Sequence, residues 1–319
     1  MKPPGVDVRR PSVRVSRGPA SRRQARRIAI PPACPLCGCA KSAELFTENN
    51  YLVRGCESCE LLFIDPYPEN VASVHDTVRD YSYERLKIVN RERFYRAEES
   101  YFRRWWPEIR PLVADARSVL DVGCGCGRLL ELLAEEDVPR RVGIELNSDR
   151  AALARDITGC EIHEVPVEQF ESRDPFDAIC MINVLSHIPS FDELFGALHR
   201  LLRPGGDLIL KVGEVKRGVQ KNDVYSWSIP DHLHFLGLRT LEVVCDTYGF
   251  DLHARRRMPF SDELFSRDFW KQPGRSTLRN VIKKAVAYTP FALSVLRGLY
   301  RVRHDERIYS TLAVLRRRA

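Results

Sequence analysis

A strand that runs into a glycine-rich turn and then a helix constrains the fold of this chain more than any other feature. Residues 119–127 are Val-Leu-Asp-Val-Gly-Cys-Gly-Cys-Gly, and a helix is predicted directly afterwards, from Arg128 to Ala134. Glycines let the backbone approach a ligand closely and direct amide groups towards it from the helix N-terminus. A dinucleotide-binding pattern would need its third glycine at position 128, which is arginine, so a nicotinamide or flavin site is disfavoured.

Short β-branched segments alternate with amphipathic segments from Ser118 onwards. Strands are predicted at 118–122, 141–145, 161–165, 177–183 and 207–212, then at 251–258 and 306–315, with helices at 128–134, 149–156, 191–202 and 240–248. Such alternation is typical of an α/β protein. We therefore expect a Rossmann-like, mainly parallel sheet of seven strands with helices on both faces. A basic helical insertion is predicted between the last two strands, at about 276–303.

An acid stands at the end of the second predicted strand of this sheet. Glu145 follows Gly123 by 22 residues and lies at the tip of the strand beside the glycine turn. A carboxylate in this place can accept hydrogen bonds from both hydroxyls of a ribose. The turn and the acid together indicate a cofactor that contains a nucleoside.

From about residue 71 onwards the chain resembles the class I S-adenosylmethionine-dependent methyltransferases. Besides the turn and Glu145, the resemblance rests on Phe-Asp-Ala-Ile at 176–179, Val-Leu-Ser-His-Ile at 184–188 and Leu-Leu-Arg-Pro-Gly-Gly at 201–206. It implies that Glu145 binds the ribose, that Val167 lies near the adenine and that Asn183 lies beside the sulfonium. It also implies a set of residues around the methionine part of the cofactor, namely Asp121, Gly123, Cys124, Gly125 and Gly127.

Two Cys-x-x-Cys pairs precede this region. Cys34 and Cys37 are separated from Cys56 and Cys59 by eighteen residues, which is the spacing of a four-thiolate zinc site built from two knuckles. Four protein ligands leave no position for water, so we expect a structural Zn²⁺ and not a catalytic one. Cys39 is left outside this set.

The cysteine-containing segment resembles the N-terminal zinc module of a bacterial group of methyltransferases. The resemblance includes Leu-Leu-Phe-Ile-Asp-Pro-Tyr-Pro at 61–68, Tyr-Ser-Tyr at 81–83 and Pro-Asp-His-Leu-His-Phe at 230–235. Members of that group act on nucleotide-linked sugars, glycolipids and secondary metabolites. The resemblance therefore implies methyl transfer to a hydroxyl, amine or carbon of a small acceptor, nucleotide- or lipid-linked acceptors included. It departs where the sugar C-methyltransferases continue into a long extra domain.

An alcohol or amine acceptor must lose a proton, and a neutral histidine is the usual base near pH 7. His232 follows the fifth strand, at the carboxyl edge of the sheet, and is the first candidate, with Asp231 as its orienting carboxylate. His187, after the fourth strand, is the second. Tyr81 and Tyr83 would cover the cofactor and present aromatic faces to the sulfonium. For these side chains the alternative is an ordinary structural role, in a helix cap, the core or an interface.

The sequence divides into an arginine-rich arm expected to be disordered (1–32), the zinc module (33–70), a helical linker or lid (71–117) and the methyltransferase domain (118–319). The net charge is +7, and the excess of basic over acidic residues lies in residues 1–30 and 251–319. Ten cysteines and no apolar leader favour a reducing, cytoplasmic location. No transmembrane helix is predicted, because no uncharged stretch is long enough.

Alternative functions remain. An RNA methyltransferase could grip its substrate with the zinc module and the arm, but residues 31–70 contain only two basic residues, Lys41 and Arg54, so nucleic acid is disfavoured as a partner. A non-catalytic scaffold is disfavoured by the intact turn. The basic insertion suits peripheral contact with a membrane, a cover over the substrate cleft or a dimer contact. The oligomeric state is left open.

Overall fold

The computed structural model describes residues 32–68, 91–223, 227–267, 270, 277–303 and 306–319. The arm at 1–31 lies outside these residues, and so do Tyr81 and Tyr83. No helix in the described part is long and apolar enough to cross a membrane.

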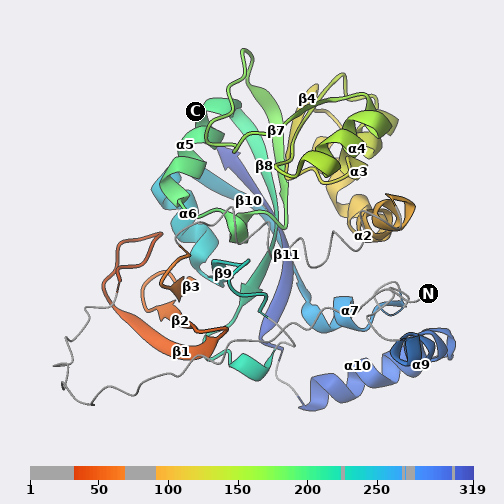
Figure 1. The fold of residues 1–319 in the computed structure, drawn as a ribbon. Coiled ribbons are helices and arrows are strands. Elements are labelled where there is room, and N and C mark those ends of the chain that lie inside the picture. Colours follow the sequence, from red (N-terminus) through yellow and green to blue (C-terminus); the bar gives the residue numbers. More distant parts are fainter. Residues whose placement is uncertain (1–31, 69–90, 224–226, 268–269, 271–276, 304–305) are drawn as a thin grey trace, which may run out of the picture. The chain divides into compact units, whose positions relative to one another are not determined.

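Within the described residues, the predicted sheet of seven strands is present (Figure 1). Its order is β6 (Glu161–His163), β5 (Arg140–Ile144), β4 (Ser118–Val122), β7 (Phe176–Ile182), β8 (Leu202–Val215), β11 (Ile308–Arg317) and β10 (Phe250–Pro259). Neighbouring strands are parallel from β6 to β8, and β11 is antiparallel to both β8 and β10. The expected Rossmann-like α/β fold is confirmed.

Helices pack on both faces of this sheet because its strands are apolar on both sides. Along β4, Val119 packs with one apolar cluster and Leu120 with the other, as the two-residue period of a strand requires. On the first face lie α2 (Arg91–Val113), α3 (Arg128–Glu135) and α4 (Ser148–Thr158), and on the second α5 (Phe191–Leu201) and α6 (Thr240–Tyr248) (Figure 1). Capping fixes several helix ends. Ser190 Oγ accepts from Glu193 N–H at the start of α5.

The cysteine-containing segment continues the sheet. Strands β1 (Ser42–Glu48), β2 (Tyr51–Cys56) and β3 (Leu62–Asp65) form an antiparallel meander. β3 pairs with a short strand, β9 (His234–Gly237), and β9 runs parallel to the end of β8. The segment that the sequence describes as a module of its own is thus hydrogen-bonded into the main sheet. Strand β9 was not among the predicted strands, because four residues carry too little pattern.

Between β10 and β11 lie the helices α7 (Phe260–Leu264), α9 (Thr277–Tyr288) and α10 (Ala292–Arg303), of which the last two fall in the range 276–303 of the expected basic insertion. Arg297 and Arg301 of α10 both reach Asp262 of α7, at 2.8 and 3.0 Å, and hold the two helices together. Two short 3₁₀ turns, η1 (Leu185–His187) and η2 (Lys221–Asp223), complete the described elements.

Candidate active site

The glycine turn lies at the carboxyl end of β4. Gly123, Gly125 and Gly127 have φ values of +74°, +58° and +87°, a region that side-chain-bearing residues rarely adopt. The N–H groups of Gly123 and Cys124 donate to the carbonyl of Ile144, at 2.8 and 3.0 Å, and so tie the turn to the end of β5. Helix α3 begins directly after Gly127, so its N-terminus faces the same edge of the sheet.

Glu145 contacts this turn, as the spacing predicts. Its carboxylate is buried and accepts from Gly125 N–H at 3.0 Å and from Asn147 N–H at 2.9 Å. The guanidinium of Arg150, in α4, lies 3.5 Å away. The sequence-predicted turn and acid are therefore brought together at the junction of β4 and β5.

Two more acids lie at the turn. Asp121 is buried in β4, and its pKa is raised well above the ordinary value by burial and by the charges of Glu98 and Glu145. Glu98 comes from α2 and accepts from Cys126 N–H, with both carboxylate oxygens at 3.1 Å. Burial raises the pKa of Glu98 to about 8. Sequence reasoning missed Glu98, because nothing near it marks a site and its contact with the turn depends on how α2 packs.

The two residues assigned to the adenine and the sulfonium occupy different settings. Val167 is buried in the loop after β6, where it packs in the same cluster as Phe170. Asn183 follows β7 with a positive φ of 59°, and its side-chain amide donates to the Tyr101 hydroxyl at 2.8 Å. Lys211 of β8 in turn donates to the Asn183 amide oxygen at 2.9 Å.

Lys211 is a buried cation that sequence reasoning also missed. Its ammonium lies 5.5 Å from the ring centre of Tyr101 and 5.3 Å from that of Trp105, both on α2. Burial lowers its pKa, while the charge of Glu263 on α7 opposes this shift. One signal could have found it, because Lys211 is a lone charge in the apolar run 208–212 of a central strand.

The candidate bases lie side by side. The rings of His187, in η1, and His232, in the loop after β8, meet edge to face with centroids 4.8 Å apart. Nδ1 of His187 lies 2.8 Å from the carbonyl oxygen of Asp231 and 3.5 Å from its carboxylate. A proton on Nδ1 would be donated to that carbonyl, which leaves Nε2 of His187 as the basic atom. The sequence assigned Asp231 to His232, and these distances show that Asp231 also lies against His187.

The donor atoms of His187, Asp231 and His232 all lie within 4.8 Å of one another, a spacing that suits proton transfer or a metal ion. A third histidine behind them, His234, is fully buried, and its Nε2 lies 2.7 Å from the carbonyl oxygen of Leu185. Burial lowers its pKa to about 3, so it stays neutral.

Comparison with known proteins identifies the family. Residues 89–255, just over half of the chain, match the family described as "Methyltransferase domain". The chain belongs to this family. S-adenosylmethionine is the methyl donor that such membership implies.

Individual relatives are similar to parts of this methyltransferase. A ubiquinone biosynthesis O-methyltransferase of Pseudomonas paraeruginosa is 28% identical over 137 residues, which cover 35% of this chain and 59% of the relative. A tRNA U34 carboxymethyltransferase of Syntrophotalea carbinolica is 35% identical over 115 residues, covering 33% and 36%. The chain thus spans less than two thirds of the length of these curated relatives.

A solved structure is similar over a longer stretch. It is the phosphoethanolamine N-methyltransferase 2 of Haemonchus contortus in complex with S-adenosyl-L-methionine. The similarity covers 81% of this chain and 63% of that one, with a TM-score of 0.56 and 17% identity. At this identity the likeness shows the fold alone.

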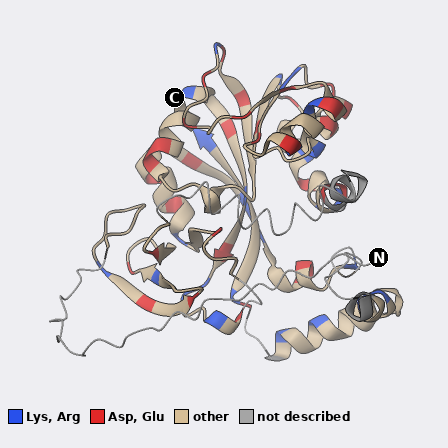
Figure 2. Ribbon diagram, viewed as in Figure 1, with Lys and Arg blue, Asp and Glu red and all other residues tan. Residues whose placement is uncertain are grey.

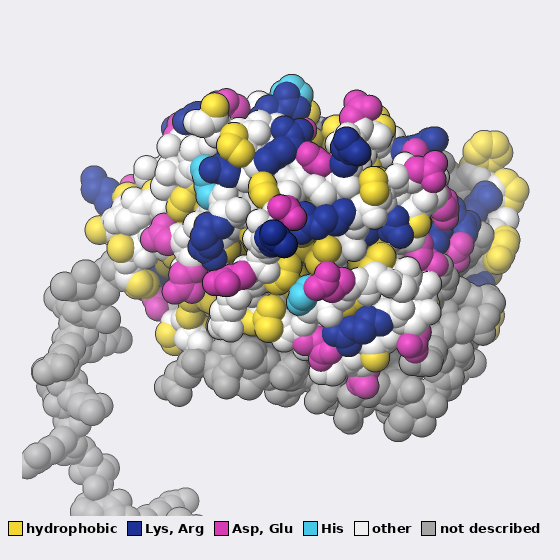
Figure 3. Space-filling model, turned by 90° about the horizontal axis from the view of Figure 1, so that it is seen from above, with side chains coloured by type: hydrophobic (Ala, Val, Ile, Leu, Met, Phe, Trp, Pro, Cys, Tyr) yellow, Lys and Arg dark blue, Asp and Glu magenta, His cyan; other side chains and the backbone are white. Residues whose placement is uncertain are grey.

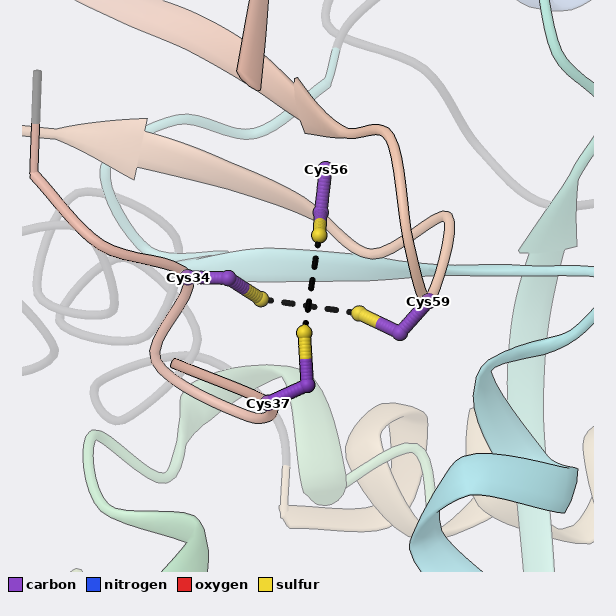
Figure 4. Close-up of side chains that lie close together, drawn as sticks. All are labelled: Cys34, Cys37, Cys56 and Cys59. Carbon is purple, nitrogen blue, oxygen red and sulfur yellow. Dashed lines mark hydrogen bonds between the residues drawn. The ribbon is translucent and has the colours of Figure 1, made fainter. Parts of the chain in front are cut away.

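The four cysteines of the methyltransferase's N-terminal segment converge as their spacing predicts (Figure 4). Cys34 Sγ lies 3.5 Å from Cys59 Sγ, and Cys37 Sγ lies 3.6 Å from Cys56 Sγ. A zinc tetrahedron with Zn–S bonds of about 2.3 Å has edges of about 3.8 Å. The knuckle turns are closed by backbone hydrogen bonds from Gly38 N–H to Cys34 and from Glu60 N–H to Cys56. The donor set and its geometry fit Zn²⁺.

The surface carries charges of both signs. Arginines recur along α10, and acids stand among the basic residues of α3 and α4 (Figure 2). Seen from above, basic side chains gather on one face with acidic and apolar ones between them (Figure 3). Three ion pairs engage surface arginines near the ends of strands: Arg203–Asp177, Arg316–Asp207 and Arg318–Asp251.

Proposed function

We propose that this protein transfers a methyl group from S-adenosylmethionine to a hydroxyl, amine or carbon of a small acceptor, such as a sugar, a glycolipid or a secondary metabolite. The observation that carries this proposal is the glycine turn at the end of β4, hydrogen-bonded to Glu145 at the end of β5. Ligand sites of open α/β sheets lie at this carboxyl edge. Membership of the methyltransferase family supports it.

In this proposal the cofactor supplies an electrophilic methyl group, and the chain's residues bind, orient and deprotonate. The turn from Gly123 to Gly127 and Asp121 hold the methionine part. Glu145 holds the ribose, Val167 lies against the adenine and Asn183 orients the sulfonium end. Displacement at a methyl carbon needs alignment more than charge stabilisation, so most of the acceleration comes from fixing the reacting groups in line.

We further propose that the histidine pair removes the acceptor's proton. The bond between His187 Nδ1 and the Asp231 carbonyl fixes the ring and its tautomer, so that Nε2 would be the atom that accepts the proton. His232, whose ring touches that of His187, would bind the acceptor or share the proton. The geometry therefore favours His187 as the base, where the sequence favoured His232.

We propose a structural Zn²⁺ held by Cys34, Cys37, Cys56 and Cys59. All four positions of a tetrahedron are then filled by thiolates, so the ion would fix the fold of β1 to β3 and take no part in chemistry. We propose a cytoplasmic location, where thiols stay reduced and can ligate the ion.

We also propose peripheral contact of α9 and α10 with an anionic lipid surface. These helices expose a series of apolar side chains: Val281, Ile282, Tyr288, Phe291, Val295, Leu299 and Val302. Basic residues such as Lys284 lie among them, the combination that favours an anionic membrane surface. Co-sedimentation with phosphatidylglycerol vesicles, but not with phosphatidylcholine vesicles, is expected. The variant Ile282→Ser/Phe291→Ser should sediment less, and equal sedimentation with both vesicle types would contradict the proposal.

The proposed activity is tested with methyl-labelled S-adenosylmethionine and a fractionated cell extract. Label is expected in a small-molecule or lipid fraction and not in RNA or protein. Label in RNA would replace the proposal by an RNA methyltransferase. Calorimetry with S-adenosylmethionine provides the preceding check, because a chain without measurable binding would be a scaffold and not an enzyme.

A further inference from the structure

Glu98 reaches the glycine turn from a helix and not from the end of a strand. It lies in α2, and its carboxylate reaches across to the backbone N–H of Cys126, just before α3 begins. A Cβ built on Gly125 would overlap Glu98 Oε1. Because residue 125 has no side chain, the turn leaves space beside it that a ligand could enter. The Glu98 carboxylate borders this space.

The surroundings of Glu98 are strongly acidic. The titratable and charged groups that interact with it are Asp121 of β4, Glu145 after β5, Glu131 of α3 and the thiols of Cys124 and Cys126. The guanidiniums of Arg128 and Arg150 approach Glu131 and Glu145, at 3.1 and 3.5 Å. Three carboxyl groups in a largely buried volume repel one another when ionised, so the volume favours a cationic ligand group.

The methionine end of S-adenosylmethionine carries such a group, its α-ammonium. We propose that Glu98 is a cofactor-binding residue that pairs with this ammonium and so distinguishes S-adenosylmethionine from nucleosides that lack an amino-acid part. The inference rests on the proposed function and deepens it. It also gives α2 a role, because the helix brings to the site an acid that the sheet does not contain.

Pairing requires an ionised carboxylate. The pKa of Glu98, at about 8 in the free protein, means that most molecules carry the proton at pH 7. Binding of the ammonium then expels this proton to the buffer, and the carboxylate and the ammonium form a charge-assisted hydrogen bond. Affinity for S-adenosylmethionine should rise from pH 6 to about pH 8, as Glu98 ionises, and should fall again at higher pH, as the ligand's ammonium loses its own proton.

The test compares two ligands on two variants of the full chain. S-adenosylmethionine and 5′-methylthioadenosine share the nucleoside, but the second lacks both the amino-acid part and the sulfonium charge. S-adenosylhomocysteine, a thioether that keeps the ammonium, separates these two differences, and Glu98→Gln should weaken its binding as it weakens that of S-adenosylmethionine. Glu98→Gln should weaken binding of S-adenosylmethionine by about 10- to 100-fold, the range for a hydrogen bond between charged groups. Binding of 5′-methylthioadenosine should change less than about twofold. The control Glu99→Gln removes the neighbouring acid, which pairs only with Arg103 in the printed contacts of the described residues, and should leave both affinities unchanged.

A second measurement needs no variant. Calorimetry of the wild-type chain at pH 7 in two buffers of different ionisation enthalpy should show close to one proton released per S-adenosylmethionine bound, and none for 5′-methylthioadenosine.

The outcomes separate this inference from the proposed function. Equal weakening of both ligands by Glu98→Gln would mean that the residue only supports the turn, and tighter binding of S-adenosylmethionine would mean that Glu98 obstructs the site. Either result overturns the inference while the proposed function stands, as does binding to the wild type without proton release. A wild-type chain that binds no S-adenosylmethionine would overturn both.

Discussion

The glycine turn and the cysteine cluster are two proposed ligand sites built in opposite ways on one sheet. At the turn, the specificity lies in the backbone, since the positive φ angles of Gly123 to Gly127 direct amides to one place while the strands behind them are held by a large apolar core. At the cluster, the specificity lies in four side chains, and β1 to β3 are short strands with many half-exposed positions. We therefore expect the glycine turn to be sensitive to any added side chain, and the cysteine cluster to be sensitive to the loss of any one thiolate.

The largest effect is expected at the turn itself. Gly125→Val should abolish binding of S-adenosylmethionine, because Val disfavours the positive φ and its Cβ would collide with Glu98. Calorimetry measures the loss, and circular dichroism should show that the fold persists. Gly196→Val, at a helical glycine with no neighbour within 4 Å of a built Cβ, is the matched control. Affinity within threefold of the wild type would refute the assignment of the turn.

The next largest effect concerns the histidine pair. His187→Ala should lower turnover by about 10²- to 10⁴-fold with little change in cofactor affinity, since a positioned general base contributes that much. His232→Ala should lower it less. If His232→Ala has the larger effect, His232 is the base. If added Mg²⁺ or Mn²⁺ restores or raises turnover, the cluster binds a metal and does not act as a base.

Glu145→Ala tests how much this side chain contributes to cofactor affinity at the glycine turn. We expect cofactor binding to weaken by about 1.5–3 kcal/mol, the range for hydrogen bonds to a charged group. The exposed acid Glu171 provides the control, and Glu171→Ala should bind as the wild type does. An unchanged affinity for Glu145→Ala would remove this carboxylate from the ribose site.

The smallest effect on cofactor binding is expected from loss of a zinc ligand. Elemental analysis should find about one zinc per chain, and Cys59→Ser should lower this value while affinity for S-adenosylmethionine stays within about threefold. Strands β1 to β3 should lose structure first, because metal binding supplies part of their folding energy. Cys160→Ser, outside the cluster, should retain the zinc. A metal-free preparation with all four thiols titratable and a single cooperative transition would contradict the zinc site.

Contiguous patterns were predictable from the sequence, and packing was not. The turn at 119–127, the acid at Glu145 and the two Cys-x-x-Cys pairs are local, so their spacing alone indicates their chemistry. Glu98 lies 28 residues before the Cys126 amide that it contacts, on a helix whose orientation depends on buried Trp105 and Ile109. His187 and Asp231 lie 44 residues apart in the sequence, so their contact likewise depends on packing and is not visible in a local pattern.

The pairing between β3 and β9 is short, and this affects how readily the two strands separate. It consists of Leu62 opposite Phe235 and Phe63 opposite His234, whereas β11 is paired with β8 along nearly its whole length. The Thr240 hydroxyl reinforces the pairing by donating to the Cys59 carbonyl and accepting from Gly237 N–H. Amide hydrogen exchange should therefore be faster in β3 and β9 than in β4 or β7. Because β9 follows the loop that carries His232, each transient opening there would also release the acceptor side of the active site.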